Sequence, residues 1–463
     1  MSNNFLRAIR RASRQIRSLG FVAVALGLIA MATTTIAAQD DATSPILFTN
    51  VNVFDGKNEA LIKDANVVVT GKLITAISTE PLAVAGGRVI DGGGRTLIPG
   101  LIDAHTHIMW NDAIETLIYE SPHEYTGVMA AANAQRMLHR GFTTVRDLGG
   151  PSYGLKKAID AGVVEGPRIF PAGFFISQTS GHGDFDSRLN YSSPHFTGQV
   201  DPAYTRGWTI IADGVAEVQK ATREALRYGA SQIKIMGSGS ITGAHDPLDV
   251  TEFTLAEMKA IVAETEKWGT YATVHAYTDQ AIQNAIKAGV RSVEHGLFAS
   301  EETMKMMKDN DVIFSTQFYS FSITPEEAGM TGETAEKYLE AQKGAQNGYE
   351  RAKKLGLKMA WGTDILGPIK LAALQPNEFE ARAKYFKPYE ILQQATSINA
   401  ELLARSGKRS PYREGALGVI AEGAYADLLI VDGNPLEDIM LMTTPDKSLA
   451  LIMKDGVIYK NEL

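Results

Sequence analysis

The chain contains no cysteine among its 463 residues. Disulfides, zinc–thiolate sites, a thiol nucleophile and a lipid-modified cysteine are therefore all excluded. Any metal ion would have to be held by histidines, carboxylates or a less usual ligand. Hydrophobic residues make up 44% of the chain and charged residues 21%, which is the balance of a soluble globular enzyme and not of a disordered chain.

No apolar segment near the N-terminus is long enough to anchor the chain convincingly in a membrane. The apolar run at residues 19–32 falls short of the roughly 20 residues that span a bilayer. It follows five arginines and precedes small residues at 35–38, which is the order of a secretory signal peptide. We therefore expect residues 1–38 to be cleaved and the enzyme to be exported, to the periplasm or the medium. A single membrane anchor is the alternative, and Arg10-Arg11 leaves a twin-arginine signal open.

An excess of basic charge is also missing. Removal of residues 1–38 takes away five of the 45 basic residues and no acidic one, which leaves 40 against 53 and a net charge of −13. Such an acidic chain argues against nucleic acid and anionic membrane as partners of the mature protein.

Short β-branched apolar runs alternate with amphipathic helical patterns eight times, many of them ending in glycine. The runs cover residues 101–107, 143–146, 168–172, 232–236, 271–277, 292–295, 312–317 and 359–363. Eight such units predict an α/β fold of the (β/α)8 barrel type, here over residues 98–408. A doubly wound open sheet is the structural alternative, but it would not need eight units.

The two ends of the chain have a different pattern. Residues 39–97 and 409–463 show short strands and turns, and each segment is too small to form a core alone. We expect them to pack together as one small β-sandwich, with the barrel inserted between them.

A His-x-His pair stands at the end of the first barrel strand. In a strand, residues two apart face the same side, so His105 and His107 can both point to the mouth of the barrel. A chance surface pair is the alternative, but barrel enzymes place their chemistry at the carboxyl ends of the strands.

Three further residues repeat this position on other strands. His275 ends the fifth strand, His295 ends the sixth, and Asp364 follows the eighth. Each alone is more often a hydrogen-bonded polar residue of the core. Together they converge on one rim of the barrel, which favours a metal centre.

Lys234 lies inside the fourth strand, between Ile233 and Ile235. If the isoleucines face the helices, alternation directs the lysine into the barrel, where an unpaired ammonium is costly. A salt bridge to a carboxylate would remove that cost. So would the addition of carbon dioxide to the neutral amine, which gives a carbamate that bridges two cations.

Three motifs resemble the amidohydrolase superfamily: LIPGLIDAHTH at 97–107, GFTTVRD at 141–147 and AYADLLIV at 424–431. The likeness extends over essentially the whole chain after residue 38. Within the superfamily the chain is most similar to the imidazolonepropionase-like group, which includes Xaa-Pro dipeptidases, carboxypeptidases releasing Arg or Lys, and ochratoxin-degrading amidohydrolases.

The resemblance implies a centre with two divalent metals, best suited to zinc. His105, His107 and Asp364 would bind the first metal and His275 and His295 the second, and N6-carboxylated Lys234 would bridge them. A hydroxide shared by the metals would attack an amide carbonyl. Asp364 would transfer the proton to the leaving nitrogen.

The substrate should be a small molecule held by loops after the strands, with His182 and Tyr277 as candidate contacts. We expect cleavage of the amide bond to a C-terminal amino acid, in a dipeptide, an N-acyl amino acid or an ochratoxin-like compound. Hydrolysis of a cyclic amide or lactone is the alternative, and Lys234 disfavours single-metal deamination. A non-catalytic scaffold would have lost ligands. Relatives are commonly homo-oligomers.

Overall fold

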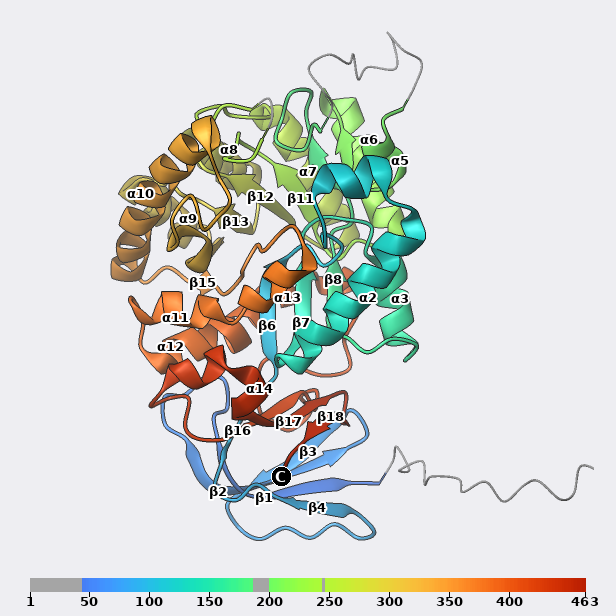
Figure 1. Ribbon diagram of the computed structural model, residues 1–463, viewed down its shortest axis with the longest axis vertical. Coiled ribbons are helices and arrows are strands. Elements are labelled where there is room, and N and C mark those ends of the chain that lie inside the picture. The colour runs from blue at the N-terminus through green and yellow to red at the C-terminus, as the bar shows by residue number, and fades with distance from the viewer. Residues whose placement is uncertain (1–43, 186–199, 244–245) are drawn as a thin grey trace, which may run out of the picture. The chain divides into compact units, whose positions relative to one another are not determined.

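The computed structural model describes residues 44–185, 200–243 and 246–463, which form a β-sheet and an α/β barrel (Figure 1). The predicted signal peptide, residues 1–38, lies outside the described residues. Within those ranges, no helix combines the length and apolar character needed to cross a membrane.

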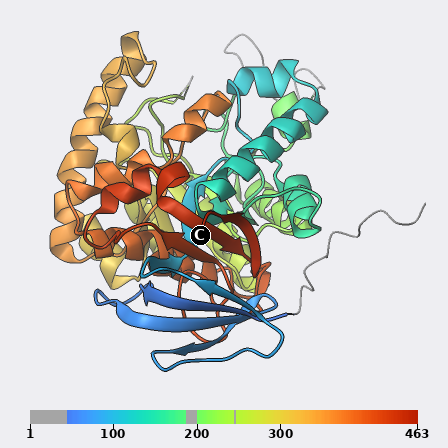
Figure 2. The ribbon, with the colours of Figure 1, turned by 60° about the horizontal axis from the view of Figure 1, so that its bottom comes forward.

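The terminal sheet is built from both ends of the chain (Figure 2). Its strands are β1 (Ile46–Val53), β2 (Ile62–Thr70), β3 (Leu73–Ser78), β4 (Arg88–Asp91), β5 (Thr96–Pro99), β16 (Leu428–Val431), β17 (Leu449–Lys454) and β18 (Val457–Asn461). They are hydrogen-bonded in the order β18-β17-β16-β5-β1-β2-β3, with β4 paired to β1. The two ends meet where β5 and β16 pair antiparallel, and apolar side chains from both ends share one buried cluster.

All eight predicted barrel strands are present. They are β6 (Leu101–Thr106), β7 (Phe142–Asp147), β8 (Arg168–Pro171), β11 (Ile233–Met236), β12 (Ala272–Ala276), β13 (Ser292–His295), β14 (Ile313–Ser315) and β15 (Met359–Ala360). Pairing between neighbours is parallel, and two additional short strands, β9 (Phe175–Ser177) and β10 (Thr209–Ile211), pair beside β11. The (β/α)8 barrel joined to a sheet from the chain's ends confirms the predicted fold class.

Backbone hydrogen bonds outside the regular ladders close the barrel. Between β8 and β11, the amide of Ser231 donates to the carbonyl of Pro171 at 2.7 Å. Between β15 and β6, Ala104 donates to Trp361 at 3.0 Å, and Asp364 donates to His105 at 2.9 Å. The last bond places Asp364 directly beside the first histidine ligand.

Helices surround the strands. They are α2 (His123–His139), α3 (Tyr153–Asp160), α5 (Pro202–Thr205), α6 (Val215–Tyr228), α7 (Leu255–Trp268), α8 (Asp279–Ala288), α9 (Glu301–Asp309), α10 (Gly332–Leu355), α11 (Asn377–Ala383), α12 (Pro388–Gln393), α13 (Asn399–Ala404) and, beside the terminal sheet, α14 (Pro445–Ser448). Helix α7 illustrates how the sequence sets the ends: Thr254 and Glu257 form a capping box, and Gly269 ends the helix at φ +68°.

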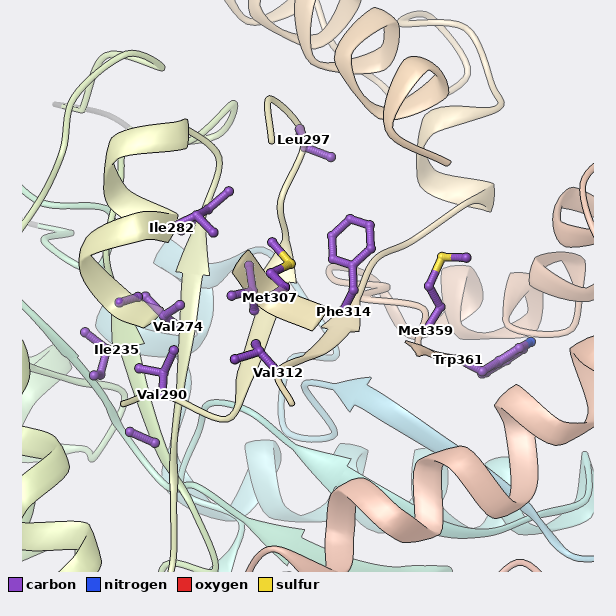
Figure 3. Close-up of a cluster of buried hydrophobic side chains, with 14 of the residues drawn as sticks. Ile235, Val274, Ile282, Val290, Leu297, Met307, Val312, Phe314, Met359 and Trp361 are labelled. Atoms are coloured by element: carbon purple, nitrogen blue, oxygen red, sulfur yellow. The ribbon is translucent and has the colours of Figure 1, made fainter. Parts of the chain in front are cut away.

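The core lies between strands and helices (Figure 3). Ile235 and Val274 on neighbouring strands pack in one cluster with Ile282 of α8 and Met307 of α9. Since alternate strand residues point the other way, the same strands direct their polar side chains into the barrel.

A buried ion pair joins the barrel to the terminal sheet. Arg168 of β8 donates to Asp427 and Asp455, which flank strands of the terminal sheet, and its guanidinium lies 4.1 Å from the ring centre of Tyr425. An arginine buried at this position without both partners would be strongly destabilising, so the pair ties the two parts in one arrangement.

Candidate metal centre

The six predicted ligands meet at the carboxyl ends of the strands. His105 and His107 end β6, His275 and His295 stand on β12 and β13, and Asp364 follows β15. The imidazoles and Lys234 are buried, and Asp364 keeps 22% of its side chain exposed. The barrel therefore brings into one pocket side chains that are up to 259 positions apart in the sequence.

One subset already has the spacing of a metal site. Asp364 Oδ1 lies 3.4 Å from Nε2 of His105 and 3.3 Å from Nε2 of His107. These three residues form a group whose ligand atoms all lie within 4.8 Å of one another. The rings of His275 and His295 stand beside them, with centroids 4.6 Å apart.

Each imidazole is oriented by a hydrogen bond at its outer edge. The Nδ1 atoms of His105, His107 and His295 contact Glu294 Oε2 at 2.9 Å, the carbonyl of Gly149 at 3.2 Å and Gln317 Oε1 at 2.7 Å. The carbonyl of Gly239 accepts a hydrogen bond from His275. Since these partners are acceptors, each Nδ1 carries the proton and each Nε2 turns a lone pair toward the centre.

Several atoms that face the centre form no hydrogen bond with any described residue. Nε2 of His105, Nε2 of His275 and Oδ1 of Asp364 are buried without a hydrogen bond. A buried acceptor without a partner is costly, and a divalent cation would satisfy all three. The donor set of imidazole nitrogens and a carboxylate oxygen fits zinc.

Burial keeps these imidazoles neutral, as metal binding requires. It lowers the pKa of His105 to about 4 and that of His295 to about 3, and it holds the pKa of His275 well below its usual value. Burial also opposes ionisation of Asp364, but the positive charge that the neighbouring imidazoles carry when they are protonated outweighs burial and places the pKa of this carboxyl far below its usual value.

Lys234 is buried among the ligands and has no countercharge in contact. Its neighbours Ile233 and Ile235 belong to the apolar core, as alternation predicts. It forms no ion pair with a carboxylate of any described residue, since Glu294 pairs with Arg146 and His105 instead. Burial lowers the pKa of Lys234 to about 8, so a substantial fraction of the amine is neutral near that pH. Among the described residues, Glu294 and Asp364 act on Lys234 through their charge without forming a salt bridge to it.

Two ligands lie in backbone conformations that side-chain-bearing residues seldom adopt. His295 has φ +68° and Asp364 has φ +52°. Such strain is found at functional sites, where the surrounding structure enforces it. It turns both side chains at the strand ends toward the centre.

Glu294 is a functional residue that the sequence analysis missed. Its carboxylate is fully buried, accepts from Arg146 Nη2 at 2.8 Å and 3.0 Å, and also accepts from the Ser292 hydroxyl at 2.7 Å. It thereby fixes the orientation of His105. The signal was present, because Val293 faces the core and alternation directs Glu294 inward.

We expect Glu294→Gln to lower metal affinity about 10- to 100-fold. The variant keeps the size of the side chain but removes the charge that holds His105 and Arg146. Metal content after dialysis against graded chelator measures the effect. Glu302→Gln, on an exposed helix face, is the matched control. Equal metal retention in both variants would contradict this role.

The two predicted substrate contacts lie beside the ligands. The ring of His182 stacks on His275 with centroids 4.4 Å apart, and the ring of Tyr277 is 4.7 Å from His275. The Tyr277 hydroxyl accepts a hydrogen bond from the amide of Ile241, which leaves its own proton free to donate.

The barrel places at its strand ends a group of two imidazoles and a carboxylate that could hold a metal ion. Residues 96–459 match the Amidohydrolase family, and the chain belongs to this family. It is a hydrolase that acts on carbon–nitrogen bonds, and the resemblance seen in its sequence motifs is confirmed.

The chain is similar to several relatives over at least 90% of its length. The chain is 29% identical over 440 residues to the ochratoxinase of Aspergillus niger, covering 92% of this chain and 88% of that protein. A prolidase crystallised with N-methylphosphonate-L-proline is 34% identical, with a TM-score of 0.83 over 90% of this chain and 100% of the other. A Xaa-Pro dipeptidase with bound methionine is 28% identical, with a TM-score of 0.78 and the same coverage.

Proposed function

We propose that the chain hydrolyses the amide bond to a C-terminal amino acid, in dipeptides or N-acyl amino acids. The similarity to a prolidase, a Xaa-Pro dipeptidase and an ochratoxinase supports this substrate class. The geometry supports it as well, because the donors stand at the carboxyl ends of the barrel strands, where barrel enzymes bind small substrates.

Two divalent metal ions, with zinc as the best fit to the donors, would occupy the centre. His105, His107 and Asp364 would hold one, His275 and His295 the other, and Lys234 would bridge them as its N6-carboxylated form. The observation that carries this assignment is Lys234, a buried amine without a carboxylate partner among four inward-facing imidazoles. A carbamate would remove the unpaired charge and supply two oxygen ligands.

When bound, the metals would polarise the amide carbonyl and lower the pKa of water. The protein's own residues do the rest. Asp364 is ionised and partly open to the pocket, so its carboxylate can accept the proton of the attacking water and pass it to the leaving nitrogen. Tyr277 would donate its hydroxyl proton to a substrate oxygen, and His182 would contact the substrate from the opposite face of His275.

The direct test is a screen of the purified protein against dipeptides and N-acyl amino acids, with zinc and bicarbonate present. We expect turnover of compounds with a free C-terminal carboxylate, and loss of turnover after chelation that added zinc reverses. No turnover of the dipeptides and N-acyl amino acids, together with turnover of lactones or ring amides, would refute the proposed substrate class.

We also propose that the enzyme is exported, on the strength of the basic, apolar and small-residue order of residues 1–38. Mass spectrometry of the mature N-terminus after fractionation would test it. An intact Met1 in the cytoplasmic fraction alone would refute export.

A further inference from the structure

The connection between β11 and α7 contacts several residues around the centre. The carbonyl of Gly239 accepts from His275, and the amide of Ile241 donates to the Tyr277 hydroxyl. Further along, Asp246 and Glu252 contact His182, which belongs to a different connection, after β9. One stretch of chain therefore holds a metal ligand and both candidate substrate contacts.

Asp246 is a buried carboxylate directed at the His182 ring. Its side chain is completely buried, and its Oδ2 lies 3.4 Å from Nδ1 of His182 and accepts from the amide of Ser240 at 2.7 Å. The Ser240 hydroxyl lies 2.6 Å from the same Nδ1. Burial raises the pKa of Asp246, but His182 more than offsets it, so the carboxyl is ionised at neutral pH. An ionised carboxylate only accepts hydrogen bonds, so its charge beside Nδ1 favours a proton on this nitrogen of His182.

The position of the ring is set from the other sides as well. The amide of His182 donates to Glu252 Oε1 at 2.8 Å, and the preceding Gly181 lies so close that an added Cβ would come within 2.4 Å of Glu252 Oε2. The ring then stacks on His275 at an interplanar angle of 27°. No described residue forms a hydrogen bond with Nε2 of His182, and 19% of the side chain is exposed.

From this geometry we propose that Asp246 is a positioning residue that acts through His182. It holds the tautomer with the proton on Nδ1 and the ring plane parallel to His275, so that Nε2 is the atom offered to the substrate. The expected change in KM rests on the proposed function. The expected position of the proton on His182 does not. No motif in the sequence points to Asp246, because its role depends on a loop contact.

The conservative variant Asp246→Asn separates positioning from packing. Its carbonyl oxygen can still accept from the Ser240 amide, but the negative charge that faces Nδ1 is lost, so the preference for a proton on Nδ1 weakens without a change in side-chain size. We expect KM to rise about 10- to 100-fold, the effect of losing a hydrogen bond to a charged group. We expect kcat and metal content to stay within about threefold, because no metal ligand is altered.

A double-mutant cycle with His182→Ala tests whether Asp246 acts through His182. If Asp246 acts through His182, Asp246→Asn has no further effect on KM in the His182→Ala background. Additive effects of the two substitutions would overturn the proposal. Asp213→Asn is the matched control, because Asp213 is an exposed carboxylate that holds the same connection through Thr179 and does not touch His182.

The position of the proton on His182 can be measured by spectroscopy without any substrate. In ¹⁵N-histidine-labelled enzyme, the His182 resonances, assigned by their loss in His182→Ala, should show a protonated Nδ1 in the native chain and a smaller fraction of protonated Nδ1 in Asp246→Asn. The same tautomer in both proteins would overturn the proposal. If no amide were hydrolysed, the proposed function would fail, while the tautomer would still decide the role of Asp246.

Discussion

Replacing Lys234 with alanine should reduce the rate of hydrolysis by about 1,000-fold or more and lower metal content below two equivalents. The side chain is buried among the predicted ligands and forms no ion pair with a described carboxylate, so we expect its contribution to be to the metal centre. The truncation leaves a cavity where the bridging group would stand. Short carboxylic acids added to the buffer should enter this cavity, replace the carbamate oxygens and restore part of the activity.

The measurements are kcat and bound metal, each with and without acetate or propionate. Asp364→Asn is the control for the rescue, because it keeps its volume and offers no cavity for an added acid. A Lys234→Ala enzyme that retained two metals and the native rate would show that the bridging assignment is wrong.

Asp364→Asn should lower kcat by about 100- to 10,000-fold, the range of a lost general acid–base group. The substitution preserves the backbone, since asparagine tolerates the left-handed region in which Asp364 lies at φ +52°. It removes the negative charge that faces Nε2 of His105 and His107 at 3.4 Å and 3.3 Å. Weaker binding of one metal should accompany the loss of rate.

Single-turnover kinetics at saturating zinc separate the two effects. If zinc restores the metal content but not the rate, Asp364 transfers a proton in addition to binding metal. Full activity in Asp364→Asn would exclude this residue from the mechanism. Asp213→Asn, an exposed carboxylate on the same chain, should behave as the native enzyme.

Much of the site was predictable because it depends on strand position. His275, His295 and Lys234 lie at positions set by the alternation of side chains along a strand and by the end of that strand. Both features can be predicted from the sequence. Eight repeats then imply that these strand ends form one ring. The predicted ligands therefore meet in one pocket without any knowledge of distances.

The supporting residues were harder to find. Glu294 of β13 and Arg146 of β7 form a buried ion pair. The role of either residue can be recognised only when the other is known to lie beside it. Asp246 lies in an irregular connection, where no period constrains the direction of its side chain. The hydrogen-bond partners of a ligand come from whichever strand or loop lies next to it in space, and sequence spacing does not encode that.

By itself, the sequence determined the class of fold, the rim on which the chemistry stands, and the absence of thiol ligands, because alternation, helix periodicity and composition are local properties. Only the tertiary structure decided that Lys234 forms no ion pair with a carboxylate of the described residues, that Glu294 orients His105, and that Asp246 reaches His182. These are contacts between distant segments, and a buried charge is paired or unpaired according to what packs against it. In this chain, closure of the barrel determined which segments pack against each buried charge.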